Sequence, residues 1–412
     1  MGMSILGRER VLALATVFTL TAFGVGPAQA AATLDPIVGF SSDAGCPTGA
    51  LNNDSAGNLY VSLSCGTGNN GSIVQLAPPT LANPHWSIMP VWTFTDAAGG
   101  SSPTGGMVSD GAGGFYGTTL WGGLGSGQGN GTLFHLSPPQ GSSEDWDLQT
   151  VRFFHGTDGN QPTSSILRKG KYLFGTTTGG GSHGAGTIYM LNLSTGKLKT
   201  VWNFTGNSDG GYPQGGLIDD GAGGFYGTTS SGGTSSQGVV YHLTPTVSGA
   251  KTFNLTPLYA FNGDSDGGFP EGTLVLWNGS LYGTCEGGGG SGFHGTVWEL
   301  APPSGGNPNW SYTVLRHLTF ADGAQPTVGP TRLGKNLYFV SPYGGQGPGA
   351  AYGTIDTLKK SGNSWSFSRR IAFNQGNGAY PNSPLLPDGA GGFYGATTGG
   401  IFGYGSVFHL TP

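Results

Sequence analysis

After its first thirty residues, this chain places its hydrophobic positions in short runs. One of them, "GVVYHLTP" at residues 238–245, is rich in the β-branched and aromatic side chains that favour strands. Clusters of Gly, Asn, Asp or Pro bound these runs, as "DGAGG" does at residues 110–114. No helical period of 3.6 residues persists over a useful length. The pattern therefore predicts an all-β protein made of many short strands.

The same phrases return along the chain at a nearly constant distance. "DGAGGFYGTT" stands at residues 110–119 and 220–229, and "DGAGGFYGAT" at 388–397. The aromatic residue of this phrase recurs at steps of 52 to 58 residues, at Tyr60, Tyr116, Phe174, Tyr226, Tyr282, Tyr338 and Tyr394. Each copy has room for four strands, which in the fourth copy are "GGLIDD", "GGFYGTT", "GVVYHLTP" and "LTPLYAF". Repeats of this length with four strands predict the blades of a β-propeller.

The two ends of the chain indicate how the ring closes. A Phe ends the fourth strand of each copy, at Phe40, Phe94, Phe154, Phe204, Phe261, Phe320 and Phe373. No three strands precede Phe40, and the last copy stops after its third strand, "GSVFHLTP". We therefore expect "ATLDPIVGF" at residues 32–40 to complete the last blade. The prediction is a seven-bladed β-propeller of four-stranded antiparallel blades, closed by the N-terminal strand so that no strand edge stays open.

The repeated phrase is interpreted as architecture. "DGAGG" supplies the turn between the first and second strands, and the aromatic residue packs between blades. "GGFYGTT", followed by a third strand such as "GTLFHLSP", resembles the Gloeo/Verruco repeat over essentially the whole chain after residue 30. Copies one and six depart from it, with "YVSLSCG" and "YFVSPYG". The resemblance implies an exported bacterial propeller and implies no catalytic residues.

The N-terminal segment reads as a secretory signal peptide. Arg8 and Arg10 precede the apolar run "VLALATVFTLTAFGVG", and small residues at Ala28 and Ala30 favour cleavage after Ala30. We therefore expect a signal peptide at 1–30, one propeller domain at 31–412, and a secreted, periplasmic or extracellular monomer. No later segment approaches eighteen apolar residues, so no membrane span is expected.

Cysteine content and charge narrow the picture. Cys46 and Cys65 are close enough in sequence to pair or to stay free, and Cys285 reads as a small buried side chain. The net charge of −5 and the scarcity of basic residues argue against nucleic acid as a partner.

The loops that join blades share one end of the ring with the loops between second and third strands. We name this end the inter-blade face. These loops contain no Lys or Arg, and they carry Asp43, Asp96, Asp158, Asp209, Asp264, Asp266 and Asp322. The sequence leaves two interpretations, an acidic ring that repels polyanions or Asp residues that cap their own turns.

The fifth copy concentrates the candidate chemistry. "NGDSDGGFPEG" and "TCEGGGGSGFHG" bring Asp266, Glu271, Glu286 and His294 to one rim, where carboxylates and a His could serve as acid and base on a glycosidic bond. "DSDG" also resembles the start of a calcium loop, which makes Asp264 and Asp266 calcium candidates. The distal Glu of such a loop is not at its proper spacing.

Aromatic residues in the same loops are candidates for ligand contact because exposed rings suit sugar stacking or protein contact. The binding candidates are Trp121, His183, Phe293, Tyr343, Phe402 and Tyr404. For Tyr212, Phe269 and Tyr380, which precede the repeated prolines, packing between blades is the expectation. His135, His242 and His409 recur at one strand position and are interpreted as structural.

Three functional hypotheses follow from these residues. The favoured one is an exported binding module for a glycan or a surface partner, with no firm cofactor. The alternatives are a secreted glycan-cleaving hydrolase or lyase with its carboxylates on the fifth-copy rim, and a structural envelope module.

Overall fold

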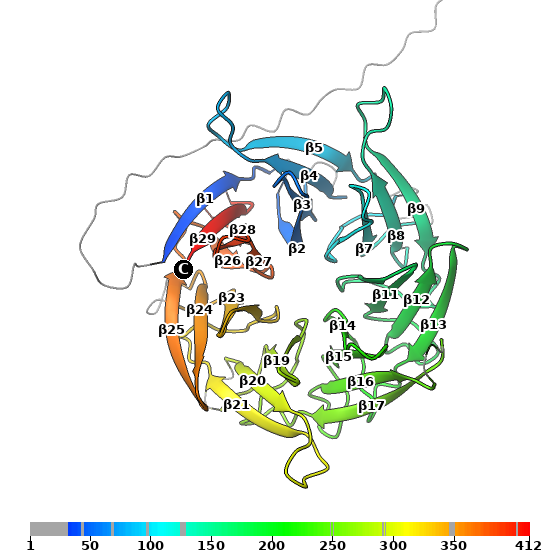
Figure 1. The fold of residues 1–412 in the computed structure, drawn as a ribbon, viewed down its shortest axis with the longest axis vertical. Coiled ribbons are helices and arrows are strands. Elements are labelled where there is room, and N and C mark those ends of the chain that lie inside the picture. Colours follow the sequence, from blue (N-terminus) through cyan, green and yellow to red (C-terminus); the bar gives the residue numbers. More distant parts are fainter. Residues whose placement is uncertain are drawn as a thin grey trace, which may run out of the picture.

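The computed structural model describes residues 32–42, 45–66, 70–95, 99–123, 129–247, 249, 251–290, 292, 294–345, 351–400 and 403–412. The predicted signal peptide lies outside this range. The described residues form strands and turns in seven sheets around a central axis, which confirms the seven-bladed propeller (Figure 1). In this part of the chain, no helix is long and apolar enough to cross a membrane.

Six blades each contain four antiparallel strands in chain order from the axis outward. Blade one consists of β2 (Pro47–Asn53), β3 (Leu59–Leu63), β4 (Ser72–Ala77) and β5 (Ser87–Thr93). Blade two consists of β6 (Val108–Ser109), β7 (Phe115–Thr119), β8 (Thr132–Ser137) and β9 (Asp147–Phe153). Blade three consists of β10 (Leu167–Lys169), β11 (Tyr172–Thr177), β12 (Thr187–Asn192) and β13 (Lys197–Asn203).

The next blades repeat this plan. Blade four consists of β14 (Ile218–Asp219), β15 (Phe225–Thr229), β16 (Val239–Pro245) and β17 (Phe253–Ala260). Blade five consists of β18 (Val275–Trp277), β19 (Ser280–Cys285), β20 (Thr296–Ala301) and β21 (Ser311–His317). Blade six consists of β22 (Thr331–Leu333), β23 (Asn336–Ser341), β24 (Thr354–Ser361) and β25 (Ser364–Ala372).

Blade seven joins the two ends of the chain. Its inner strands are β26 (Ala379–Pro381), β27 (Leu386–Pro387), β28 (Phe393–Gly399) and β29 (Ser406–Thr411), and its outer strand is β1 (Thr33–Gly39). β1 pairs with β29 from Thr33 opposite Thr411 to Gly39 opposite Ser406, and Figure 1 shows the first and last strands side by side. The predicted closure by the N-terminal strand is confirmed, so β29 has no open edge.

A repeated backbone contact joins each blade to the blade before it. The residue ahead of each repeat proline has a φ of 54° to 60°, at Cys46, Ser102, Gln161, Tyr212, Phe269, Gln325 and Tyr380. Its N–H donates to a carbonyl of the preceding blade, as Tyr212 does to Ala185 at 2.8 Å. The proline then packs on a glycine of that blade, since a Cβ on Gly186 would lie 2.7 Å from Pro213 Cδ. The seams between blades are therefore held by backbone geometry.

The glycine in "FYGTT" accommodates a large ring from the next strand. Gly227 lies opposite Tyr241, and a Cβ at Gly227 would collide with the fully buried ring of Tyr241. Blade one instead pairs Val61 with Val74, which are similar in size. Phe339 and Asp356 reverse the order of large and small residues in blade six. In each blade, the residue at the glycine position of the second strand and the residue opposite it in the third strand must fill the same space. This requirement explains why copies one and six depart from the repeated phrase.

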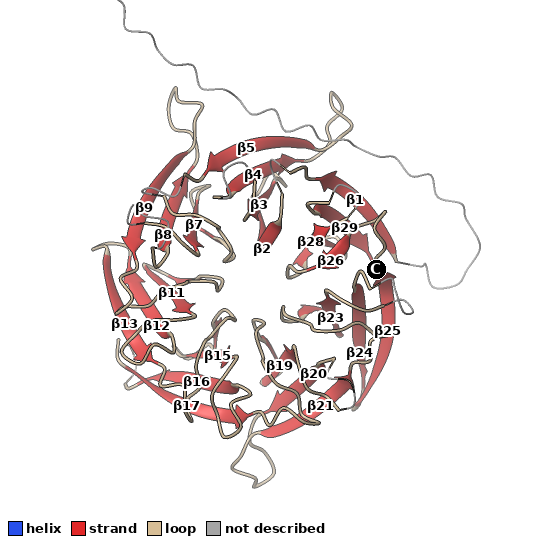
Figure 2. Ribbon diagram, turned by 180° about the vertical axis from the view of Figure 1, so that it is seen from behind, coloured by secondary structure: helices blue, strands red, loops and turns tan. Residues whose placement is uncertain are grey.

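Aromatic contacts cross most seams, as predicted for the repeated phrase. Tyr60 lies 4.6 Å from Phe115 of blade two, measured between ring centroids. Hairpins that join the third and fourth strands of blades one, two and five project beyond the ring, and each carries a Trp (Figure 2). These Trp residues lie 5.7–6.0 Å from a Tyr of the preceding blade, in the pairs Trp86–Tyr394, Trp146–Tyr60 and Trp310–Tyr226.

The "DGAGG" turns have a structural role. Asp220 accepts the N–H groups of Ala222 and Gly224 at 2.7 and 2.8 Å, and its other oxygen lies 2.8 Å from Nε2 of His242. The same bond recurs between His135 and Asp110 and between His409 and Asp388. These bonds hold the pKa of each Asp below its usual range. The three histidines therefore secure turns, as the sequence indicated.

One expected strand end is wrong. Phe320 was predicted to end the fourth strand of the fifth copy, but Leu318 takes that place. Leu318 is buried, and its N–H donates to Gly295 O at 3.0 Å. Phe320 is exposed on the inter-blade face. Both residues are hydrophobic and two positions apart, so the sequence pattern alone suits either of them.

Candidate functional site

The exposed aromatic side chains gather at one end of the propeller. Among the described residues, the seven most exposed aromatic residues all lie at the inter-blade face, with 37–46 % of each residue's surface accessible. They are Trp121, Tyr212, Phe269, Phe320, Tyr343, Tyr380 and Tyr404. The rest of the described surface has no aromatic residue of comparable exposure. Exposed rings confined to one face make that face the candidate binding surface.

Most of these rings occupy one of two neighbouring positions in their blade. One position precedes the repeat proline, and the other lies in the loop after the second strand. Phe269 takes the first position in blade five and lies over Gly287, where a Cβ would be 3.0 Å from the ring. Tyr380 lies over Gly399 in the same way. Packing between blades was the expectation for Tyr212, Phe269 and Tyr380. It is wrong for the exposed side chains of Tyr212 and Phe269, whose backbones make the seam. The ring of Tyr380 does contact the preceding blade, since its centroid lies 5.7 Å from that of Tyr343 and 6.1 Å from that of Tyr352.

Trp121 and Tyr343 take the second position, in blades two and six. The first position of these blades holds a smaller residue, Ser102 or Gln325. Each of blades two, four, five, six and seven thus carries one exposed ring at this pair of positions. The sequence signal that could have revealed the arrangement is the constant offset of these residues from the repeated Tyr and Pro.

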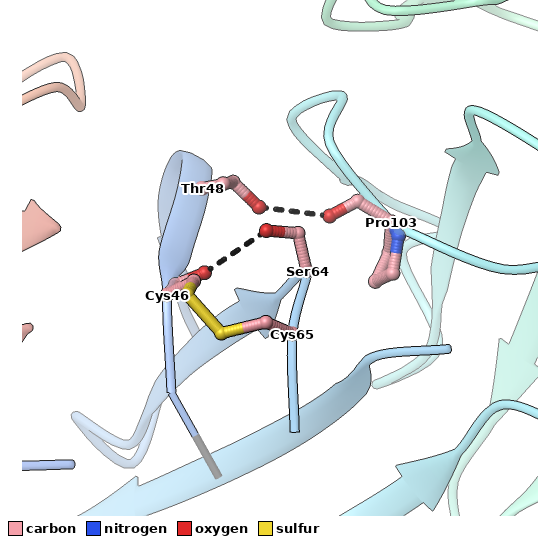
Figure 3. The surroundings of a disulfide bond; sticks show 5 residues. All are labelled: Cys46, Thr48, Ser64, Cys65 and Pro103. Atoms are coloured by element: carbon pink, nitrogen blue, oxygen red, sulfur yellow. Dashed lines mark hydrogen bonds between the residues drawn. A yellow bond between two sulfur atoms is a disulfide. The ribbon is translucent and has the colours of Figure 1, made fainter. Parts of the chain in front are cut away.

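In blade one, the same two positions hold a disulfide (Figure 3). Cys46 and Cys65 are bonded, with their Cα atoms 5.4 Å apart. The backbone N–H of Ser64 donates to Cys46 O at 3.0 Å, and Thr48 Oγ1 donates to Pro103 O of blade two at 2.9 Å. Of the two options that the sequence left open, pairing is the one that the structure shows. Cys285 is free and buried, as predicted.

Two neighbouring cavities lie among the rings of blades five and six. The first has a volume of about 550 Å³ and is lined by Gln237, Asn262, Asp264, Phe269, Glu286 and Gln325, together with glycines. The second has a volume of about 380 Å³ and is lined by His294, Phe320, Ala324, Gln325, Tyr343 and others. Gln325 borders both cavities. Volumes of this size are typical of small-ligand sites, which are roughly 300–1,000 Å³.

The loop aspartates mostly serve their own turns. Asp209 and Asp266 are buried and accept backbone N–H groups of Thr205 and Asn262 at 3.0–3.2 Å. A side chain of the preceding fourth strand also bonds each loop Asp, in the pairs Arg152–Asp158, Trp202–Asp209, Tyr259–Asp266 and Arg316–Asp322. The acidic ring is therefore wrong at these four positions, and the capping interpretation is confirmed there. Asp43 and Asp96 lie outside the described residues.

Arginines from outer strands thus reach a face whose loops contain none. The guanidinium of Arg369 likewise donates to Gly345 O at 2.8 Å and lies 3.4 Å from the buried carboxylate of Asp356. Burial raises the pKa of Asp356 to about 7 despite this arginine. The sequence shows only that the loops lack basic residues, and it does not reveal how far the side chains of the strand arginines reach.

The carboxylates of blade five fall into two groups. Asp266 is engaged in its turn, whereas Glu271 and Glu286 lie near each other at the mouth of the central channel. Burial raises the pKa of Glu271 to about 7, and the charge of Glu286 adds to the effect. Burial also raises the pKa of Glu286. Glu271 is the one charged member of a ring of residues that follow the repeat prolines, namely Thr48, Thr104, Thr163, Gln214, Glu271, Thr327 and Asn382.

The equivalent positions of blade three agree with this proximity. Thr163 and Thr178 are their equivalents in blade three, and their hydroxyl oxygens are 2.7 Å apart. Glu271 is further fixed by Gln214, whose Nε2 donates to Oε1 at 2.5 Å. Glu271 borders the channel cavity of about 320 Å³, and Glu286 borders the larger first cavity. The pair therefore links the channel to the inter-blade face.

The remaining candidates are dispersed. His294 lines the second cavity, with its ring 5.6 Å from Phe320 between centroids. His183 is exposed on blade three and bonds Ser182 Oγ at 2.9 Å. Tyr404 is exposed on blade seven, and Phe293 and Phe402 lie outside the described residues. No three His, Cys, Asp or Glu residues gather around a metal position in the part that the structure describes, and of the two calcium candidates only Asp264 is exposed.

The Gloeobacter/Verrucomicrobia repeat matches residues 46–298, which is more than half of the chain. The chain belongs to this family. This member of the family is a closed propeller. No curated protein matches the sequence.

Solved structures resemble the chain in fold only. A candidate oxidoreductase (glucose dehydrogenase) from Thermus thermophilus is 13 % identical, with 92 % of this chain and 100 % of that chain covered and a TM-score of 0.46. A candidate 6-phosphogluconolactonase from Bacteroides uniformis is 14 % identical, with 86 % and 89 % covered and a TM-score of 0.46.

Proposed function

We propose that this protein is an exported carbohydrate-binding propeller that holds a neutral glycan on its inter-blade face. The observation that carries the proposal is the confinement of the exposed rings to that face. Flat aromatic faces pack well against the C–H faces of sugar rings, and a rigid set of blades holds them in place. The arginines that reach this face from outer strands, Arg152, Arg316 and Arg369, are paired with Asp158, Asp322 and Asp356, which disfavours their attraction of acidic polymers.

The backbone supports the same proposal. Tyr212, Phe269 and Tyr380 adopt backbone φ values of 55° to 56°, which residues other than glycine rarely adopt. Such strain costs of order 1–3 kcal/mol per residue and clusters at functional sites. Gly, with 82 residues in the chain, occupies none of the seven pre-proline positions. The same φ occurs at Cys46, Ser102, Gln161 and Gln325, so it belongs to the seam and holds the three exposed rings in fixed positions on the face.

Export is part of the proposal. The basic and apolar N-terminal segment supports it, as does the disulfide between Cys46 and Cys65, since such bonds persist in oxidising compartments. A surface or secreted location would bring the inter-blade face into contact with polysaccharides.

Native gel electrophoresis in the presence of soluble polysaccharides tests the proposal. We expect gels containing laminarin, hydroxyethyl cellulose or galactomannan to retard the protein, and polygalacturonate to retard it much less. Mobility that is identical in all gels would contradict glycan binding and would leave the structural envelope module as the better hypothesis.

A second candidate function is hydrolysis of the bound glycan, favoured by Glu271 and Glu286. A carboxyl with a pKa near 7 can hold a proton for the glycosidic oxygen, and a neighbouring carboxylate can accept a proton from the attacking water. The test is the release of reducing ends from the same polysaccharides. Activity that is lost in Glu271→Gln and Glu286→Gln but kept in Glu144→Gln, on an exposed distant hairpin, would establish hydrolysis. No release by the unmodified protein would exclude it for these substrates.

A further inference from the structure

The two cavities of blades five and six share a wall whose position is fixed. Gln325 borders both, and its backbone N–H donates to His294 O at 3.0 Å. The loop around Phe269 is equally constrained, because Gly268 and Gly287 exchange two hydrogen bonds of 3.0 and 3.1 Å. Asp264 O accepts the N–H of Gly289 at 2.6 Å. The cavities are therefore preformed, which lowers the entropic cost of binding.

Aromatic surface continues from one cavity to the next. Phe269 stands in the first cavity, and Phe320 and Tyr343 stand in the second. Beyond the second cavity, the ring centroid of Tyr380 lies 5.7 Å from that of Tyr343. The ring centroid of Tyr352 lies 6.1 Å from that of Tyr380. This row runs across blades five, six and seven. Four of the seven most exposed rings of the described face belong to it, at Phe269, Phe320, Tyr343 and Tyr380.

The polar groups between these rings suit hydroxyl groups. Gln237, Asn262 and Gln325 can both donate and accept hydrogen bonds, and Asp264 and Glu286 can accept them. No Lys or Arg is among the described residues that line either cavity. Carboxylates without a basic neighbour disfavour an anionic ligand, while amides, carboxylates and flat rings together match a neutral sugar chain.

We infer that the two cavities form one groove, the blade-five groove, which binds a linear neutral glycan. Consecutive sugar rings stack on Phe269 and Tyr343, and their hydroxyls bond Gln325 and Glu286. The inference rests on the proposed function and narrows it from the whole inter-blade face to one arc. Trp121 of blade two and Tyr212 of blade four are equally exposed but are not among the residues that line either cavity.

Matched alanine variants test the groove by electrophoresis in graded concentrations of laminarin, hydroxyethyl cellulose and galactomannan. Phe269→Ala and Tyr343→Ala remove rings inside the groove. Tyr212→Ala and Trp121→Ala remove rings at the same two repeat positions outside it. With the polysaccharide that retards the unmodified protein most, we expect the dissociation constant to rise at least five-fold for each groove variant. We expect it to change less than two-fold for each control, and all four variants to keep the thermal unfolding midpoint of the unmodified protein.

The outcomes separate the groove from the function. Equal weakening by groove and control variants, or weakening by the controls alone, would overturn the groove while glycan binding stands. No retardation of the unmodified protein by any of the three polysaccharides would overturn both. If a groove variant were unfolded, Phe269→Leu and Tyr343→Leu would replace it, because each keeps a hydrophobic side chain but removes the flat ring, and the same five-fold rise is required.

Discussion

At the scale of single residues, comparison of equivalent positions in the seven copies identifies the side chains that differ from the rest. Position by position, the ring of residues after the repeat prolines is neutral except at Glu271. That carboxyl accepts a hydrogen bond from Gln214, and the neighbouring Glu286 resists its ionisation. A group whose pKa is raised in the folded state binds its proton more tightly there than in the unfolded chain. Its ionisation therefore opposes folding.

Glu271→Gln should change how stability depends on pH. The folded pKa of about 7 lies above the usual 4.5, so the free energy of unfolding contributed by Glu271 falls as pH rises between these values. We expect the variant to be about 1–3 kcal/mol more stable than the unmodified protein at pH 8, and similar to it at pH 4. Urea unfolding at both pH values measures the difference. Glu144→Gln is the control, and a constant offset between pH 4 and pH 8 would show that the carboxyl is not perturbed.

At the scale of elements, each blade depends on the match between its second and third strands. The glycine of "FYGTT" leaves space for the large ring opposite it in the third strand, as Gly227 does for Tyr241. Blade one divides the same volume between Val61 and Val74. The degenerate copies are thus alternative solutions to one packing problem.

Gly227→Ala should destabilise the protein by about 1–3 kcal/mol, because the added methyl overlaps the buried ring of Tyr241. Thermal and urea unfolding measure the loss. Gly376→Ala is the control, since Gly376 lies in an exposed loop with an ordinary φ. The double variant Gly227→Val with Tyr241→Val, which imitates blade one, should be more stable than Gly227→Val alone. A single variant as stable as the unmodified protein would refute this account of the repeat.

At the scale of the whole molecule, stability depends on closure. β1 covers the edge of β29, and the N–H of Phe40 donates to Gly405 O at 2.9 Å, as the residue that ends the fourth strand does in the other blades. Backbone hydrogen bonds at each seam then join neighbouring blades around the ring. Closure also fixes the relative positions of the exposed rings, because they are distributed over several blades.

A chain that starts at Ser41 should lose this closure. We expect a lower unfolding midpoint and self-association through the open edge of β29. A chain that starts at Ala31, which lacks only the predicted signal peptide, is the control. Differential scanning calorimetry and size-exclusion chromatography give the two readouts. Equal midpoints and equal elution volumes for the two chains would show that β1 is dispensable.

The fold was predictable from the sequence because its determinants are local and repeated. Seven turns, seven prolines and a split terminal copy specify the blade, the count and the closure without reference to distant contacts. The site was predictable only in part. Sequence placed Trp121, Tyr343, Glu271 and Glu286 on the correct face, since loop position decides the end of the ring.

Only the tertiary structure decided which of these groups reach solvent and which meet. Asp266 and Asp322 turned inward because fourth-strand side chains bond them, and Phe320 came to the surface because Leu318 filled the core. The proximity of Glu271 and Glu286, and the succession of rings across three blades, depend on segments that lie more than ten residues apart in the sequence. Contacts of that kind depend on how the blades curve and pack, so a local sequence pattern does not determine them.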